Sequence, residues 1–394
     1  MKYKKCCLKL PSHRRPVSVP VGAVLAAREE KPGIMFGKAA PGGVPIEILQ
    51  EFRQANRAQR AWTALYGHIR PCISADFHGR KFVAAGSKLY YSDKNKWNYV
   101  SDFLVDYVPN LFGREWFETE KAKPEADRHP VFQWRVDGVR YMQDQPRQPD
   151  GSYVVHVPSG PLAAYQAFAF NLFAIEDNGR LDDLLLERLK NTDQFQGARH
   201  EVFAEATCLR AGFLIEHEDQ QDRARRHAEF TATHKSTGQR ISVEAKSKHR
   251  AGVLGHPGAA QPYEKLSLRF GGLLNDALAK NPPFPLVVFL DTNLPFHSAE
   301  RVLGWDPKEP GKPSRVMRTL IDRDRKEHGG KDLYAMLIFT NHPHHYVGKN
   351  EPDPRKHILA IMPLTLQGIL GQALADLYKA ANLYGNIPNE FPRR

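Results

Sequence analysis

The apolar residues of the segment 46–66 recur at helical spacing, which predicts an amphipathic helix. Three further stretches favour helices, and the second of them is apolar on nearly every side, as in a helix buried within a core. These stretches are 97–113, 162–175 and 181–190. Between the first two helices, the segment 81–93 predicts a short hairpin. We therefore expect a mainly helical N-terminal domain over 46–190. The side chains expected to face its core from the first helix are Ile46, Leu49, Phe52, Trp62 and Leu65.

From residue 191 onward, strand patterns alternate with helical ones. A helix ending at Gly212, a C-cap signal, precedes a strand at 213–219 and a hairpin of two half-buried strands. Later strands are continuous apolar runs, which is typical of strands buried on both faces. The expected strands are 228–234, 240–246, 284–295, 333–341 and 357–364, and the expected helices are 198–212, 263–280, 313–327 and 365–384. This order predicts an α/β domain over 191–394, with a mixed central sheet flanked by helices.

The composition is that of a globular protein, with 394 residues, 41% of them hydrophobic and 25% charged. No apolar run approaches the length of a membrane-spanning helix. The net charge of +12 favours a polyanionic partner. Residues 1–34 alone carry a net charge of +6. We interpret 1–45 as a disordered basic leader and linker; a start at Met35 or a secretion signal are the alternatives.

Four cysteines, Cys6, Cys7, Cys72 and Cys208, are scattered without a C-x₂-C pair. This spacing predicts neither a disulfide framework nor a zinc site, and it favours a reducing cytoplasm.

The N-terminal aromatic residues have two interpretations. They form a core, as most such residues do, or some of them stack on unpaired bases. The residues in question are Trp62, Tyr66, Tyr90, Tyr91, Trp97, Trp116 and Trp134.

The stretch 241–248, with the sequence ISVEAKSK, alternates apolar and polar residues, so Glu244 and Lys246 share one face of the predicted strand. If the Thr-Gly pair at 237–238 forms a two-residue turn, Glu229 of the preceding strand lies opposite Lys246. Opposed residues share a face, so the two carboxylates and the ammonium would converge. A slip of one residue would move Glu229 to the other face. Two carboxylates suit Mg²⁺, which takes one or two of them together with water and substrate phosphate.

These residues resemble the PD-(D/E)xK nuclease superfamily, which has the restriction-endonuclease-like fold. Glu244-Ala245-Lys246 corresponds to its E-x-K element, and Glu229 stands where the first acid of the hairpin belongs. The resemblance covers roughly 195–291 well, the remainder of the chain after 291 only by general α/β character, and the N-terminal domain not at all.

The helix upstream extends this resemblance. Its sequence, GARHEVFAEATCLRAGF, is similar to the helix that opens the core of Holliday-junction-resolvase-like members. Glu201 stands eleven residues before Gly212-Phe213, where an acid is common in those members, and Glu205 follows one helical turn later on the same face.

The resemblance implies a set of roles. Glu229 and Glu244 would bind Mg²⁺ or Mn²⁺ together with the Ala245 carbonyl, and Lys246 would activate or orient a water. Glu201 would act through a water or a second ion.

One departure from the family is that its first acid is usually Asp. Glu229 is longer by one methylene, so the ion would shift or the site would be impaired; Asp219 and Asp222 are alternative donors that lie before the hairpin. The alternative interpretation is a solvated face of the sheet, on which Glu244 and Lys246 form a weak ion pair and have no catalytic role.

Basic residues flank these acids, as expected for phosphate contacts, although a solvated loop is the alternative. The candidates for nucleic-acid binding are Arg223, Arg225, Arg226, Lys248 and Arg250. The three histidines in 341–346 favour a surface turn over a metal site. Asp291, which ends an apolar strand, either belongs to a site or caps the next segment.

The sequence therefore predicts a Mg²⁺-dependent endonuclease acting on DNA, in restriction-like defence or repair, with RNA as an alternative substrate. A catalytically inactive nuclease-like module that binds nucleic acid or protein is the alternative function. No membrane partner is expected, and the oligomeric state is left open between a monomer and a homodimer.

Overall fold

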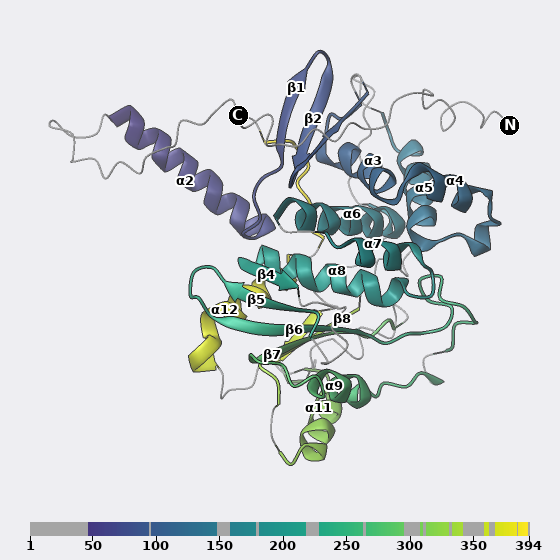
Figure 1. Ribbon diagram of the computed structural model, residues 1–394, viewed down its shortest axis with the longest axis vertical. Helices are drawn as coiled ribbons and strands as arrows, with labels where there is room; N and C mark the ends of the chain where they lie inside the picture. Colours follow the sequence, from purple (N-terminus) through teal and green to yellow (C-terminus); the bar gives the residue numbers. More distant parts are fainter. Residues whose placement is uncertain are drawn as a thin grey trace.

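The computed structural model describes residues 46–93, 96–147, 158–178, 181–217, 228–262, 265–294, 308–309, 313–330, 333–341, 358–361, 367–383 and 385–392. These residues form an α/β structure with two sheets, one of three strands and one of six (Figure 1). No helix in the described ranges has the length and apolar character needed to cross a membrane.

The N-terminal region is partly helical and also contains the smaller sheet. The predicted hairpin is confirmed as β2 and β3, but a third strand, β1, joins it and was not predicted. The elements are α2 (Ile46–Tyr66), β1 (Ile73–Phe77), β2 (Arg80–Ala85), β3 (Lys88–Tyr91), α3 (Val100–Phe112), α4 (Arg114–Ala122), a 3₁₀ turn (Glu125–Asp127), α5 (Pro130–Gln143), α6 (Gly160–Asn178) and α7 (Asp183–Lys190).

The first helix differs from expectation in what it buries. α2 projects from the rest of the molecule (Figure 1), and Leu65 is 51% exposed instead of facing a core. Trp62 is half-buried, and its Nε1 donates a hydrogen bond to the Ile69 carbonyl at 2.8 Å. The polar run between Phe52 and Trp62 interrupts the apolar stripe, and among the described side chains Trp62 provides the contact with the segment that follows α2. The side chains of Ile46, Leu49 and Phe52 lie outside the described part of the structure.

The seven aromatic residues with two interpretations divide between the core and partly exposed positions. Tyr90, Trp97 and Trp134 are buried, whereas Trp62, Tyr66, Tyr91 and Trp116 are half-buried. The two described cysteines, Cys72 and Cys208, are buried free thiols.

The larger sheet has the order β4-β5-β6-β7-β8-β9. The first three strands are antiparallel, β6, β7 and β8 are parallel, and β9 is antiparallel at the edge. Its elements are α8 (Phe195–Arg210), β4 (Phe213–His217), β5 (Phe230–His234), β6 (Arg240–Ser247), α9 (Gly271–Leu278), β7 (Leu286–Asp291), α11 (Arg315–Glu327), β8 (Met336–Thr340), β9 (Ile358–Ile361) and α12 (Gln367–Ala381). The predicted mixed sheet flanked by helices is confirmed at this level.

The helix predicted over 263–280 is shorter, because α9 begins only at Gly271. Two backbone carbonyls in the segment before it are used by distant side chains. The Ser267 carbonyl accepts from Arg250 at 3.1 Å, and the Arg269 carbonyl accepts from Lys248 at 3.2 Å. These contacts hold the segment extended against the loop that follows β6.

Helices cover both faces of the larger sheet. α8 and α12 pack on one face and α9 and α11 on the other (Figure 1). α8 carries two apolar stripes. One stripe joins the core of the N-terminal region, and the other joins the core beneath the sheet. The first stripe consists of Phe195, Ala198, Val202, Ala206 and Leu209, and the second of Phe203, Ala204 and Cys208.

Candidate functional site

The β5–β6 hairpin closes with a wider turn than predicted. His234 and Gln239 are the last paired residues, so the turn has four residues, and Gly238 adopts a φ of 69° within it. The Thr237 hydroxyl bonds the His234 ring at 2.9 Å and stabilises this wider turn. Phe230 consequently pairs with Val243. The expectation that Glu229 lies opposite Lys246 is wrong by two residues.

A shift of two residues preserves the face, because side chains alternate with a period of two. The Glu229 amide donates to the Val243 carbonyl at 3.1 Å, and the register continues to place Glu229 opposite Glu244. The predicted convergence of Glu229, Glu244 and Lys246 on one face therefore holds in this register. Lys246 forms an ion pair with Oε1 of Glu244.

A fourth charged group, Lys280, lies just after α9 and was not predicted. Its Nζ lies 2.6 Å from Glu244 Oε1 and 3.8 Å from Glu229 Oε1. α9 packs on the face of the sheet that carries Val288, and Val288 pairs with Glu244 in the parallel register, so α9 covers the face that carries these acids. The sequence signal was a lysine at the end of the helix predicted over 263–280, but the direction of its side chain depends on how that helix packs.

The electrostatics of this cluster follow from its burial. Burial and the neighbouring carboxylates of Glu201 and Glu244 raise the pKa of Glu229 to about 7, although Lys280 and Lys246 act against this rise. Burial alone would lower the pKa of Lys246, but the carboxylates of Glu244 and Glu229 outweigh it and raise that pKa. Lys246 is therefore held as an ammonium at neutral pH.

The two helix acids lie beside this cluster. Glu201 accepts two hydrogen bonds from the Arg188 guanidinium, at 2.5 and 2.7 Å. Glu205 is buried, its Oε2 lies 3.0 Å from Nε2 of His217, and burial raises its pKa. Glu201, Glu205 and Glu229 line one small cavity of about 20 Å³. This cavity places the helix acids next to Glu229, and Lys280 links Glu229 to Glu244.

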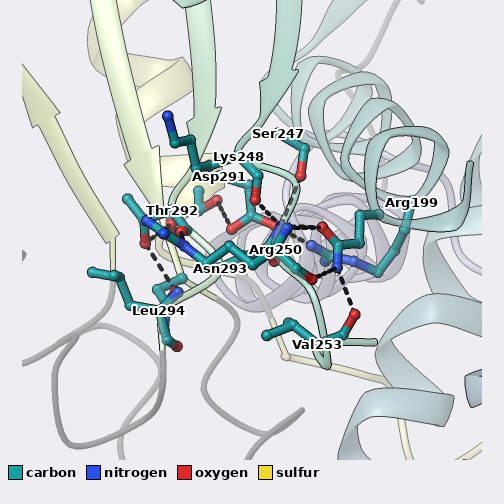
Figure 2. Close-up of polar contacts among 12 residues, drawn as sticks. Arg199, Ser247, Lys248, Arg250, Val253, Asp291, Thr292, Asn293 and Leu294 are labelled. Atoms are coloured by element: carbon teal, nitrogen blue, oxygen red, sulfur yellow. Dashed lines mark hydrogen bonds and ion pairs between the residues drawn. The ribbon is translucent and has the colours of Figure 1, made fainter. Parts of the chain in front are cut away.

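Asp291 takes part in a buried network and not in an open site (Figure 2). Its carboxylate forms an ion pair with Arg199 of α8 and accepts from the Thr340 hydroxyl at 3.1 Å. Its carbonyl accepts from the Lys248 amide at 2.8 Å. The Asp291 carboxylate thus ties α8 to the sheet, and it does not cap the segment that follows β7.

Two candidates for nucleic-acid binding, Lys248 and Arg250, lie in the described part of the structure, and both make hydrogen bonds within the protein. Arg250 is buried, and its Nε donates to the Thr292 carbonyl at 2.9 Å (Figure 2). Its backbone amide donates to Gln196 Oε1 at 3.0 Å. Lys248 is half-buried, and its pKa is lowered by burial and by the Arg250 charge. Arg250 thus holds the loop after β6, and its guanidinium is engaged by the Thr292 and Ser267 carbonyls.

Several sequence candidates lie outside the described residues. They are Asp219, Asp222, Arg223, Arg225, Arg226 and the histidines at 342, 344 and 345. Ala245 is described; it is buried and pairs with Phe289 in the parallel register.

No group of three or more His, Cys, Asp and Glu side chains in the described ranges is gathered closely enough to hold a metal ion. Mg²⁺, however, commonly takes one or two carboxylates, with water and substrate phosphate as the other ligands. Glu244 is fully buried, and its Oε2 makes no hydrogen bond to any described residue. An unpaired buried carboxylate oxygen beside a second carboxylate, Glu229, is a donor set that fits such an ion.

Comparison with known proteins gave no match to any protein-family model, curated protein sequence or solved structure.

Proposed function

We propose that this protein is a divalent-metal-dependent nuclease that hydrolyses phosphodiester bonds in DNA. The observation that carries the proposal is the hairpin register, which gathers Glu229, Glu244 and Lys246 on one face of the sheet. The order of α8, three antiparallel strands, α9 and a parallel β7 supports the resemblance to the restriction-endonuclease-like fold.

In this proposal Glu229 and Glu244 hold a Mg²⁺ or Mn²⁺ ion, with the Ala245 carbonyl beside them. When bound, such an ion neutralises a phosphate oxygen and lowers the pKa of water. Lys246 has a raised pKa and so acts as an ammonium that orients the attacking water and offsets the developing negative charge. Glu201 lies next to Glu229 and orients water from the helix side, while Arg188 fixes its carboxylate.

A second candidate function, an inactive nuclease-like binding module, is favoured by one observation. The carboxylates already have protein cations, because Glu244 contacts Lys246 and Lys280, and Glu201 contacts Arg188. A site neutralised in this way has less need of a metal ion, and a divalent ion must displace or share these contacts to bind.

Plasmid cleavage with Mg²⁺, with Mn²⁺ and with EDTA tests the nuclease proposal. The substitution Lys246→Met should slow metal-dependent cleavage roughly 100-fold or more, because it removes a preorganised charge from the transition state. Lys235→Met in the exposed turn of the same hairpin is the matched control and should cleave at the wild-type rate.

If the wild-type protein cleaves no duplex, single-stranded, branched or RNA substrate with either ion, the nuclease proposal fails and the binding module remains. A parallel digest of DNA and RNA identifies the substrate. Equal rates for Lys246→Met and Lys235→Met would remove Lys246 from the mechanism.

A further inference from the structure

The sheet formed by β1, β2 and β3 has one face in the core and one face turned outward. Val83 and Ala85 of β2 are fully buried, and Tyr90 of β3 is buried with its hydroxyl donating to Glu176 at 2.8 Å. Side chains alternate along each strand, so the neighbours of these residues face away from the core. Tyr91, directly after Tyr90, therefore points to the opposite side of the sheet.

The outward face is apolar and aromatic. Two of its members are large and well exposed, Phe77 at 63% and Ile73 at 43%. Alternation and register assign eight residues to it, with one cation and no acid among them. They are Ile73, Ala75, Phe77, Arg80, Phe82, Ala84, Leu89 and Tyr91.

Three of these rings form a row across all three strands. The ring centroids of Phe77 and Phe82 lie 6.4 Å apart, and those of Phe82 and Tyr91 lie 6.0 Å apart. The Arg80 guanidinium lies over the Tyr91 ring, 5.5 Å from its centroid.

The turn between β1 and β2 determines the strand register that aligns these three rings. His78 and Gly79 both adopt positive φ, 49° and 71°, as in the tight two-residue turns of hairpins. Phe77 is therefore paired directly with Arg80, and its ring lies diagonally from that of Phe82.

An exposed apolar face of this kind marks an interaction site in a globular protein. Flat rings beside a guanidinium match unpaired bases, because bases stack on aromatic faces while a cation meets the phosphates. The absence of acids among the eight outward residues and the net charge of +12 of the whole chain favour the same polyanion. Base pairs inside a duplex offer no free base face to such a surface, so the expected ligand is single-stranded.

We propose that the outward face of β1–β3 is a stacking platform for the unpaired bases of single-stranded nucleic acid. Phe77, Phe82 and Tyr91 supply the rings, and Arg80 contacts the backbone. The platform deepens the proposed function by naming its substrate class, and it rests on that function only for nucleic acid being the substrate.

Fluorescence anisotropy with a labelled oligothymidine of about 20 nucleotides tests this platform in EDTA at low salt. EDTA prevents cleavage, so failure of stacking and failure of catalysis are seen separately. Phe77→Ala should weaken binding about tenfold, as expected for the loss of one stacked base. Phe77→Trp should restore it. Leu184→Ala, at a residue that is 52% exposed on α7, is the matched control and should bind as the wild type does.

Four results would overturn the proposal. The first is an absence of oligothymidine binding by the wild type. The second is an unchanged affinity of Phe77→Ala when its thermal unfolding shows it to be folded. The third is an equal loss of affinity of Phe77→Ala for a blunt duplex of the same length. The fourth is a dimer in size-exclusion chromatography with light scattering that Phe77→Ala dissociates, since this face would then be a contact between copies.

Discussion

The substitution Glu229→Gln should stabilise the metal-free protein at alkaline pH. Glu229 has a side chain only 18% exposed, and its pKa rises from 4.5 to about 7 in the folded state. A pKa difference of one corresponds to about 1.4 kcal/mol, so ionising Glu229 costs the folded protein about 3 kcal/mol. Glutamine is neutral at every pH and avoids this cost.

The sign follows from proton binding. The folded state holds the Glu229 proton more tightly than the unfolded state, so the contribution to stability is lost as pH rises from 4.5 to about 7. At pH 8 the full cost applies to the wild type, whereas near pH 4.5 it is less than about 0.5 kcal/mol. Glu229→Gln should thus exceed the wild type by about 3 kcal/mol at pH 8 and nearly equal it at pH 4.5.

Urea unfolding in EDTA, followed by tryptophan fluorescence at both pH values, measures this difference. Glu216→Gln on β4, whose side chain is 64% exposed, is the control and should change stability by less than about 0.5 kcal/mol. A Glu229→Gln protein that is no more stable than the wild type at pH 8 would refute burial and carboxylate repulsion as the causes. An equal gain at both pH values would refute ionisation as its source.

Three other outcomes are expected. Arg199→Met should destabilise the protein by about 3–5 kcal/mol in the same urea assay, because it leaves the buried Asp291 carboxylate without its guanidinium. An unchanged urea midpoint would contradict the stabilising role of this ion pair. Gly67→Ala should lower the melting temperature measured by circular dichroism, since φ is 81° and an added Cβ would lie 2.4 Å from the Arg210 carbonyl oxygen; an unchanged value would count against this close approach. Lys280→Met should lower the Mg²⁺ concentration that gives half-maximal thermal stabilisation, because an ammonium that competes for the carboxylates is removed. An unchanged or higher concentration would argue against that competition.

The strands of the larger sheet could be predicted well from the sequence, because the spacing of their apolar residues and their lengths are typical of strands. β5 and β6 alternate in polarity, and β7 and β8 are continuous apolar runs. The start of α9 was missed because the carbonyls of the segment before it are bound by Lys248 and Arg250, which are distant in sequence from them.

The candidate site was predictable in its residues but not in its register. Thr237 holds a four-residue turn by bonding the His234 ring, a side-chain contact that turn statistics do not include. The sheet face predicted for Glu229 was still correct, because the predicted register was wrong by two residues and side chains alternate with a period of two. Lys280 was missed because its position depends on the packing of the crossover helix over the sheet.

The two stripes of α8 have a consequence for how the chain can be divided. Each stripe is buried in a different core, so neither core is complete when this helix is removed. Cutting the chain at residue 190 would uncover the stripe from Phe195 to Leu209 and leave an apolar helix face open to aggregation. The two regions should therefore melt as one cooperative unit, and grafting the hairpin acids onto another scaffold would require α8 to travel with them.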